Sequence, residues 1–317
     1  MNLQPEKQWW NGKARAKLPD AVLLDARRWQ SSRHSETVQQ FDKRSRLKVS
    51  MLFIGFLLVM LVYRFVPIHV SVTVCAVLVL GTFFIPYTRI FMHSQMHWGL
   101  GGGPISRFLL GHFVSLLFSV PQTGYSFGHR MHHRFDNDLD SNGRPKDLQS
   151  TYIFSRGSKP THPLLWIPYY IFVFQHLITA FLVLHKGNGR ERLWFMVELG
   201  AIVIFHFTLW VEVPIFYLSV YLPALFLAWI GSAVVLYMMH AVDAEDYIIH
   251  PTNTSISPFF NRFGDNDGYH IEHTLFPGVH PIYLPRLHAV MDLDPRQILR
   301  EHYVVAGIKY LLGVKRK

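Results

Sequence analysis

Four long apolar runs constrain the fold of this 317-residue chain more than any other feature of its sequence. They cover residues 49–66, 70–88, 193–211 and 215–240. Each is close to the roughly 20 residues that a helix needs to cross a hydrocarbon layer of about 30 Å. Only 16% of the residues are charged and mean hydropathy is +0.16, so too little polar sequence remains to cover four such runs in a water-soluble core. The sequence therefore predicts an integral membrane protein.

The positions of Lys and Arg predict how these runs cross the membrane, because both residues concentrate in short cytoplasmic loops. Basic segments precede the first run, separate the two pairs of runs and end the chain, at residues 43–48, 186–192 and 315–317. The linkers 67–69 and 212–214 contain neither Lys nor Arg. Two hairpins, 49–88 and 193–240, therefore place every basic segment on the cytoplasmic side.

Two further apolar stretches, 105–120 and 163–184, are ambiguous. The first is short for a span, and a full span at the second would move either the basic segment after it or the polar region before it to the far side. We therefore predict that both are interfacial or re-entrant helices on the cytoplasmic side. The predicted fold is an all-α membrane protein with four transmembrane helices in two hairpins and a cytosolic helical cap. Its predicted parts are a cytosolic N-terminal segment (1–48), a membrane domain (49–300) and a basic C-terminal tail (301–317).

Composition excludes several classes of site. The single cysteine, Cys75, rules out an internal disulfide framework, a Cys-ligated zinc site and an iron–sulfur cluster held by this chain alone. The net charge of +10 is accounted for by the topogenic segments facing anionic lipid head groups. The chain shows no basic-aromatic module, so nucleic acid is not an expected partner.

Histidine is unusually frequent, with 19 residues. Seven lie in three boxes with helical spacing, all on the predicted cytoplasmic side: His93 and His97; His129, His132 and His133; His270 and His273. Spacings of three and four residues bring imidazoles together on a helix face. Seven ligands exceed the four of a tetrahedral zinc site, so they suit two first-row metal ions, and iron, copper and zinc all accept nitrogen donors.

An eighth histidine, His240, ends the fourth run, where an ionisable group is a functional candidate by default. Asp243, one turn further on, is a candidate to accept a hydrogen bond from its ring and so orient it.

The order of these boxes resembles the membrane fatty acid desaturase superfamily. The resemblance runs from about residue 45 to 300, and its most specific part is the segment Asn266-Asp-Gly-Tyr-His270-Ile-Glu-His273-Thr-Leu-Phe-Pro277. That segment is similar to the family pattern N-x-x-Y-H-x-E-H-H-L-F-P. The resemblance implies a non-haem di-iron centre held by the seven box histidines, with His240 as an additional ligand. Asn266 resembles a position that reaches a metal ion through water in some members.

The resemblance also implies a reaction. Two iron ions with O2 as co-substrate would remove hydrogen from an unactivated C–H bond of a lipid acyl chain, and desaturation of a fatty acid is the favoured outcome. Hydroxylation, carotenoid-type oxidation and oxidative decarboxylation to an alkene stay open as alternatives. The chain contains no H-P-G-G and no G-x-G-x-x-G after a strand, so two electrons would come from a separate ferredoxin-, cytochrome- or flavoprotein-type donor.

One position departs from the family pattern, since Thr274 stands where the last histidine of the third box is expected. Either a metal ion keeps an open or water-filled position, or His240, Glu272 or His280 fills it. Candidates to support the ligands from nearby are Asp136, Asp138, Asp140, Asp265, Asp267, Tyr125 and Tyr269. Two classes outside the family also stay open. A haem membrane cytochrome is disfavoured because the clusters lie outside the spans, and a non-catalytic relative is favoured only by Thr274.

Overall fold

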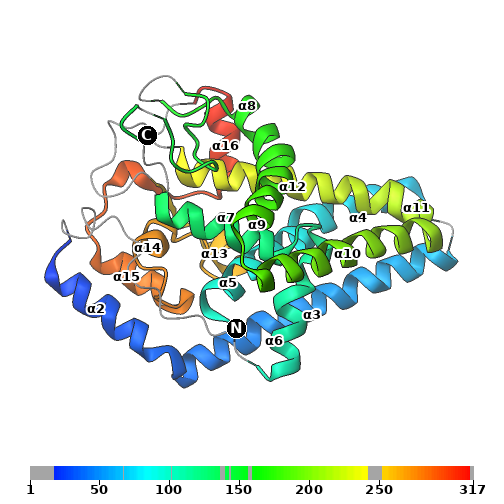
Figure 1. The fold of residues 1–317 in the computed structure, drawn as a ribbon, viewed down its shortest axis with the longest axis horizontal. Coiled ribbons are helices and arrows are strands. Elements are labelled where there is room, and N and C mark those ends of the chain that lie inside the picture. Colours follow the sequence, from blue (N-terminus) through cyan, green and yellow to red (C-terminus); the bar gives the residue numbers. More distant parts are fainter. Residues whose placement is uncertain are drawn as a thin grey trace. The chain divides into compact units, whose positions relative to one another are not determined.

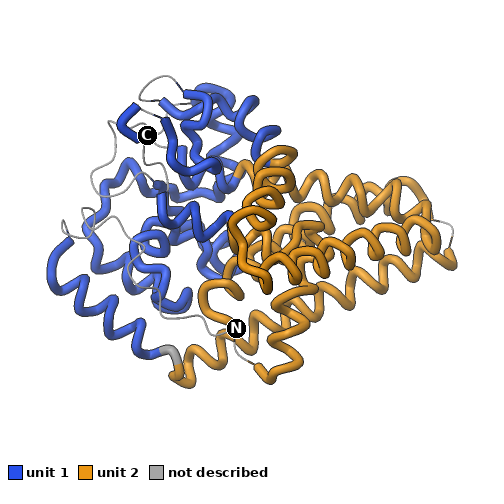
Figure 2. Tube along the Cα trace, in the orientation of Figure 1, with its two compact units in different colours: residues 1–33, 128–170, 235–317 blue, residues 34–127, 171–234 orange. Residues whose placement is uncertain are grey.

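The computed structural model describes residues 18–66, 68–100, 102–135, 140–142, 144–155, 159–241 and 252–314. Regular structure in these ranges is almost entirely helical (Figure 1), which confirms the all-α class. The exception is a parallel pair of two-residue strands, β1 (Thr254–Ser255) and β2 (Ile298–Leu299). The chain forms two compact units (Figure 2): unit 1 contains residues 1–33, 128–170 and 235–317, and unit 2 contains 34–127 and 171–234.

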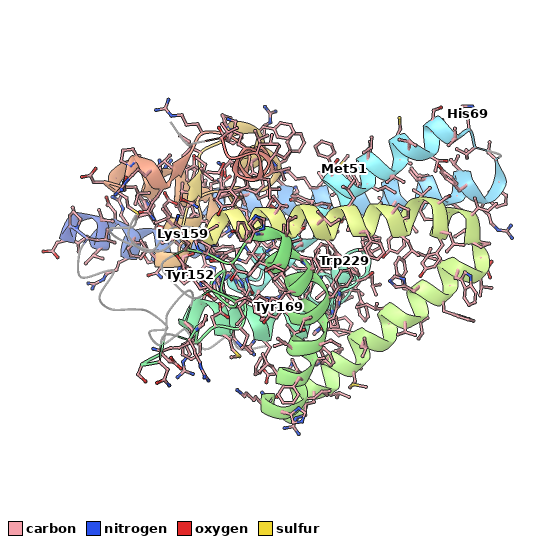
Figure 3. All side chains as sticks on the ribbon, turned by 90° about the horizontal axis from the view of Figure 1, so that it is seen from above. Met51, His69, Tyr152, Lys159, Tyr169 and Trp229 are labelled. Atoms are coloured by element: carbon pink, nitrogen blue, oxygen red, sulfur yellow. The ribbon has the colours of Figure 1, made fainter. Side chains whose placement is uncertain are left out.

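Long helices dominate unit 2. They are α3 (Glu36–Phe65), α4 (Val70–Val79) continued by the π-helical turn η2 (Leu80–Phe84) and α5 (Ile85–Trp98), α10 (Gly189–Glu212), and α11 (Pro214–Phe216) continued by η5 (Tyr217–Tyr221) and α12 (Leu222–His240). Figure 3 shows His69 at the turn between α3 and α4. The Ser35 hydroxyl caps the start of α3, and a reciprocal capping box of Asn188 and Glu191 starts α10.

Five helical segments among the described residues are long and apolar enough to cross a membrane: Glu36–Phe65, Val70–Trp98, Pro163–Lys186, Gly189–Glu212 and Pro214–His240. Four of them contain the four predicted spans. The fifth is built from α8 (Pro163–Pro168), η4 (Tyr169–Ile178) and α9 (Thr179–Lys186), and it covers the stretch that we predict to be interfacial. A sixth span is possible on the same criteria if Pro104–Leu117 and Gln122–Phe135, which meet at a bend of 91°, are counted together. The four-span arrangement therefore stays a prediction.

Aromatic rings and one glycine hold the helices of unit 2 together. Phe56 on α3 is buried, and its ring centroid lies 5.5 Å from that of Phe216 and 5.6 Å from that of Tyr221. Gly81 allows η2 to approach α12 closely, because a Cβ there would lie 2.8 Å from the carbonyl oxygen of Ala224. Small residues of this kind let helix backbones meet where lipid provides no hydrophobic driving force.

A buried carboxylate fixes the start of α7 (Gln122–Phe135), the helix that carries the second histidine box. The backbone N–H of Thr123 donates to Glu198 Oε2 at 2.7 Å and its hydroxyl donates to Oε1 at 3.0 Å. The Nδ1 atom of His112, at the end of α6 (Pro104–His112), lies 2.6 Å from Oε1. The first N–H groups of a helix have no partner within it and form its positive end, so Glu198 both satisfies a donor and complements the helix dipole.

Unit 1 contains shorter helices joined by well-bonded turns. They are α2 (Asp20–Ser31), α13 (Pro258–Phe263), α14 (His270–Leu275), α15 (Leu284–Val290) and α16 (Tyr303–Leu311). Gly268 precedes α14, and a Cβ there would lie 2.6 Å from the carbonyl oxygen of Ser255, so only glycine fits. The Tyr303 hydroxyl lies 2.9 Å from the carbonyl oxygen of Gly268 and 3.0 Å from that of Asn253. These contacts fix the turn from which the third histidine box begins.

Replacing Glu198 by leucine should destabilise the protein strongly. The substitution removes the acceptor of Thr123 and leaves His112 without its carboxylate, and removing one partner of a buried pair costs on the order of 3 kcal/mol. Glu198→Gln keeps an oxygen for the Thr123 N–H and should cost about 1 kcal/mol. Thermal unfolding in detergent would measure both, and equal stability of the leucine variant and the wild type would show that this anchor is not needed.

Candidate metal centre

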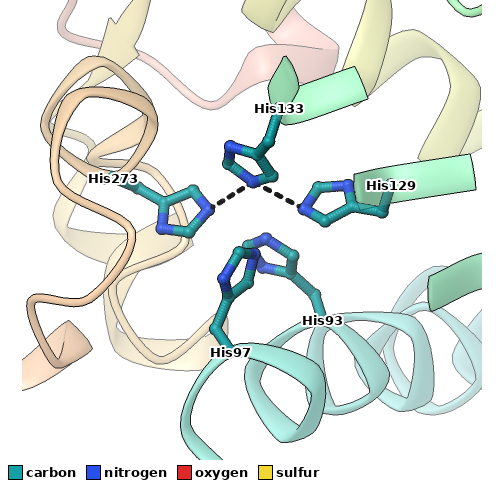
Figure 4. Close-up of side chains that lie close together, drawn as sticks. All are labelled: His93, His97, His129, His133 and His273. Carbon is teal, nitrogen blue, oxygen red and sulfur yellow. Dashed lines mark hydrogen bonds between the residues drawn. The ribbon is translucent and has the colours of Figure 1, made fainter. Parts of the chain in front are cut away.

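Unit 1 contains two clusters of imidazole rings, which we call the first and the second cluster. The first cluster is His129 and His133 from α7 and His273 from α14. The Nε2 atom of His133 lies 2.8 Å from that of His129 and 3.2 Å from that of His273, as the dashed lines in Figure 4 mark. The three ligand atoms lie within 4.8 Å of one another. His129 and His273 are buried and His133 is half-buried.

The second cluster joins His132 from α7, His240 from the end of α12 and His270 from α14. The Nε2 atom of His240 lies 3.1 Å from that of His132 and 2.9 Å from that of His270. All three side chains are buried. The three ligand atoms again lie within 4.8 Å of one another.

These spacings match what a metal ion requires. Two nitrogen atoms bound to one ion at about 2.0–2.1 Å lie roughly 2.9 Å apart at a right angle and roughly 3.4 Å apart at the tetrahedral angle. The observed Nε2–Nε2 distances of 2.8–3.2 Å fall at or close to this interval in both clusters. A proton can bridge only two nitrogen atoms at a time, whereas a cation accepts lone pairs from all three. The donor sets therefore fit a first-row metal ion in each cluster.

Helical spacing explains why the same two helices serve both clusters. On α7, His129 and His133 are four residues apart and share a face, while His132 lies one residue round the helix. On α14, His270 and His273 are three residues apart. The ring centroids of His132 and His133 are 6.0 Å apart, as are those of His270 and His273. The two clusters are therefore neighbours, and each contains at least one ligand from α7 and one from α14.

The first histidine box lies in unit 2. His93 and His97 occupy consecutive turns of α5, both are buried, and their ring centroids are 4.8 Å apart. Figure 4 shows both rings on one side of that helix. Their role as ligands stays a prediction.

Asp147 is a residue that the sequence analysis missed. Its Oδ2 atom lies 2.6 Å from Nδ1 of His132, and its Oδ1 atom accepts the N–H of Gln149 at 2.9 Å. A carboxylate that accepts a hydrogen bond from Nδ1 keeps the ring proton on that nitrogen. The lone pair of the other nitrogen, Nε2, is then directed at the second cluster. Asp147 follows His132 by fifteen residues with no helical or turn spacing, so nothing local in the sequence marks it.

Asp140, the described acid among the three candidates after the second box, does not show this arrangement. Asp140 accepts the backbone N–H groups of Arg144 and Asn142, which lower the pKa of its carboxyl and make it the cap of its own turn. Asp136 and Asp138 lie outside the described residues, as does Asp243.

Glu272 lies within the third box, but its carboxylate contacts other groups. Oε1 lies 2.5 Å from Nδ1 of His288 on α15, and Oε2 accepts the hydroxyl of Thr254 at 2.6 Å. The same hydroxyl oxygen accepts the backbone N–H of Ile271. Burial and then the charge of Glu272 raise the pKa of Tyr269, the residue before α14. Glu272 therefore anchors α14 to β1 and α15.

The remaining candidates shape the turns around α14. Asn266 has a positive φ of 66° and donates from Nδ2 to the carbonyl oxygen of Pro281, and the N–H of Asp267 donates to Gly264. His280 is buried and its Nδ1 accepts the N–H of Ile282. Of the three groups considered for the missing ligand, His240 alone belongs to one of the two clusters.

Helices long and apolar enough to cross a membrane, together with buried imidazole clusters, are typical of a membrane protein with a histidine-box metal site. The family model described as fatty acid desaturase matches residues 68–304, and the chain belongs to this family. This confirms the resemblance noted in the sequence and implies an oxidoreductase. Members of the family use iron, which the nitrogen donor sets accept. A search of curated proteins finds no match to the chain.

Removing the carboxylate of Asp147 should weaken metal binding. Loss of such a partner to a ligating histidine typically lowers metal affinity 10- to 100-fold. Asp147→Asn is therefore expected to bind a divalent ion in the second cluster about 10- to 100-fold more weakly than the wild type. Competition titration of Co2+ against a chromophoric chelator would measure it. Asp140→Asn is the matched control and should bind like the wild type; an unchanged affinity in Asp147→Asn would contradict the role of this carboxylate.

Proposed function

We propose that this protein is an O2-dependent di-iron oxidase that desaturates lipid acyl chains. The observation that carries the proposal is the pair of neighbouring imidazole clusters, with nitrogen atoms spaced as ligands of one ion, in a member of the fatty acid desaturase family. The two clusters support one iron ion each. We include His93 and His97 among the ligands, because the family pattern places a histidine box at that position.

The chain's own residues have definite tasks in this proposal. Iron, when bound, supplies the oxidising power for breaking a C–H bond, using O2 and two electrons from outside the chain. Asp147 holds a proton on Nδ1 of His132 and so keeps Nε2 free of a proton and available to the ion. Glu272 fixes the position of α14, which contributes a ligand to each cluster. Burial of the rings limits the access of water to the oxidising centre.

The proposed setting is a membrane whose cytoplasmic face carries the histidine boxes, with four spans in two hairpins. Large apolar side chains exposed along α3 and α10, among them Met51, Val62, Val203 and Ile204, are suited to contact lipid. The proposed substrate is the acyl chain of a lipid, a coenzyme A ester or a carrier-bound fatty acid. The electrons come from a separate ferredoxin-, cytochrome- or flavoprotein-type partner, and the net charge of +10 favours an acidic one.

Lipids from cells that express the protein should contain an additional double bond. Mass spectrometry is expected to show a loss of two hydrogens, which His132→Ala abolishes by removing a ligand of the second cluster. His34→Ala, at an exposed histidine in neither cluster, is the control and should retain the product. A gain of oxygen would indicate hydroxylation and a shortened alkene would indicate decarboxylation. Identical lipids with the wild type and His132→Ala would overturn the catalytic proposal.

Cysteine labelling tests the proposed topology. In a Cys75→Ala background, single cysteines at exposed positions replace Lys159 and Lys186, which flank the fifth apolar helix. If that helix is interfacial, an impermeant reagent should label both only after the membrane is permeabilised. His69→Cys, in the turn between α3 and α4, is the control and should be labelled in intact cells. Labelling of positions 159 and 186 from opposite sides would show that residues 163–186 span the membrane.

A further inference from the structure

The second cluster offers a metal ion three protein ligands. Its members are His132, His240 and His270, and within the described part of the chain no fourth histidine, cysteine or carboxylate places a ligand atom within 4.8 Å of all three. Glu272 is engaged by His288 and Thr254, as described above. Three protein ligands with a remaining position are typical of metal sites that bind an exogenous ligand, whereas purely structural sites are filled by the protein.

Thr274, on the same helix as His270, supplies a second observation. It lies four residues after His270 on α14, so the two side chains share a face of the helix, and the Thr274 Cβ is tilted back toward the turn of His270. Its side chain is 2% exposed, and its hydroxyl has no hydrogen-bond partner among the described residues. A threonine in a helix commonly donates to the carbonyl oxygen four residues earlier, and this hydroxyl does not.

A buried hydroxyl without a partner is unfavourable, so this group calls for a ligand of its own. A position on the metal ion beside it would provide one. We propose that the ion held by His132, His240 and His270 keeps one coordination position for a small exogenous ligand, water or an anion of the size of azide, and that the hydroxyl of Thr274 hydrogen-bonds that ligand. The inference rests on the proposed function in one respect, namely that the second cluster binds metal.

The positive charge of the bound ion favours an anionic ligand. The three imidazoles bind as neutral groups, and the carboxylate that reaches the cluster, Asp147, does so through the far nitrogen of His132. A divalent ion at this buried place therefore retains positive charge that a small anion can offset. The threonine hydroxyl can donate to such an anion or to a bound water. A histidine at position 274 would displace either ligand.

The test uses full-length protein in detergent, loaded with Co2+ and titrated with azide while the visible absorption of the cobalt is recorded. The wild type should show a saturable change. Thr274→Ser keeps the hydroxyl and should bind azide like the wild type. Thr274→Val nearly preserves the shape but removes the hydrogen bond, so azide should bind roughly three- to tenfold more weakly. Thr274→His supplies a further ligand and should suppress the response.

Two further variants separate the possible failures. His270→Ala should lower the number of bound cobalt ions per chain by one; an unchanged number would mean that the second cluster holds no metal, and this inference and the two-metal proposal would both fail. His34→Ala, at an exposed histidine in neither cluster, should leave azide affinity unchanged, and a loss of azide binding in this variant would show that the response does not come from the second cluster. If cobalt binds normally but azide affinity is the same in the wild type, Thr274→Val and Thr274→His, this inference alone is overturned.

Discussion

The convergence of imidazole nitrogen atoms at about 3 Å from one another is the constraint on which the rest of the structure depends. Nitrogen lone pairs that face each other repel unless a proton or a cation lies between them, and burial removes the water that would otherwise intervene. A fold that holds three such rings together, twice, needs rigid helices and fixed ring orientations. The distances of 2.8–3.2 Å within both clusters show that α7, α12 and α14 meet this requirement.

Buried carboxylates provide much of that rigidity, and each uses both of its oxygen atoms. Glu198 binds the first turn of α7 and the ring of His112. Asp147 orients His132 near the other end of the same helix. Glu272 ties α14 to Thr254 and His288. An ionised carboxylate is stable away from water only when its oxygens are bonded, so each acid links the elements that it touches. Together they fix α7 and α14, the two helices that contribute ligands to both clusters.

The third box differs from the family pattern at one position, and the residues around that position have different roles as a result. Thr274 removes an imidazole from α14, and the three groups that might compensate are used differently. His240 contributes to the second cluster from the end of α12, Glu272 anchors its own helix, and His280 caps the turn before α15. Among the described residues the cluster thus keeps three nitrogen donors, and a buried hydroxyl lies one helical turn after His270, an arrangement suited to a site that binds a small ligand rather than one saturated by the protein.

The sequence by itself determined the membrane class, the all-α fold, the histidine boxes and the family, because apolar runs and helical spacing are local patterns that survive without knowledge of packing. It did not reveal Asp147, nor that Glu272 faces His288, because these contacts join segments whose separation in the chain carries no signal. The interfacial role that it predicts for residues 163–184 stays a prediction, because the helix Pro163–Lys186 is also long and apolar enough to cross a membrane. Only the tertiary structure sorted the box histidines of unit 1 into two clusters and showed that the hydroxyl of Thr274 is buried without a partner among the described residues, because ring orientation and burial depend on how distant helices pack.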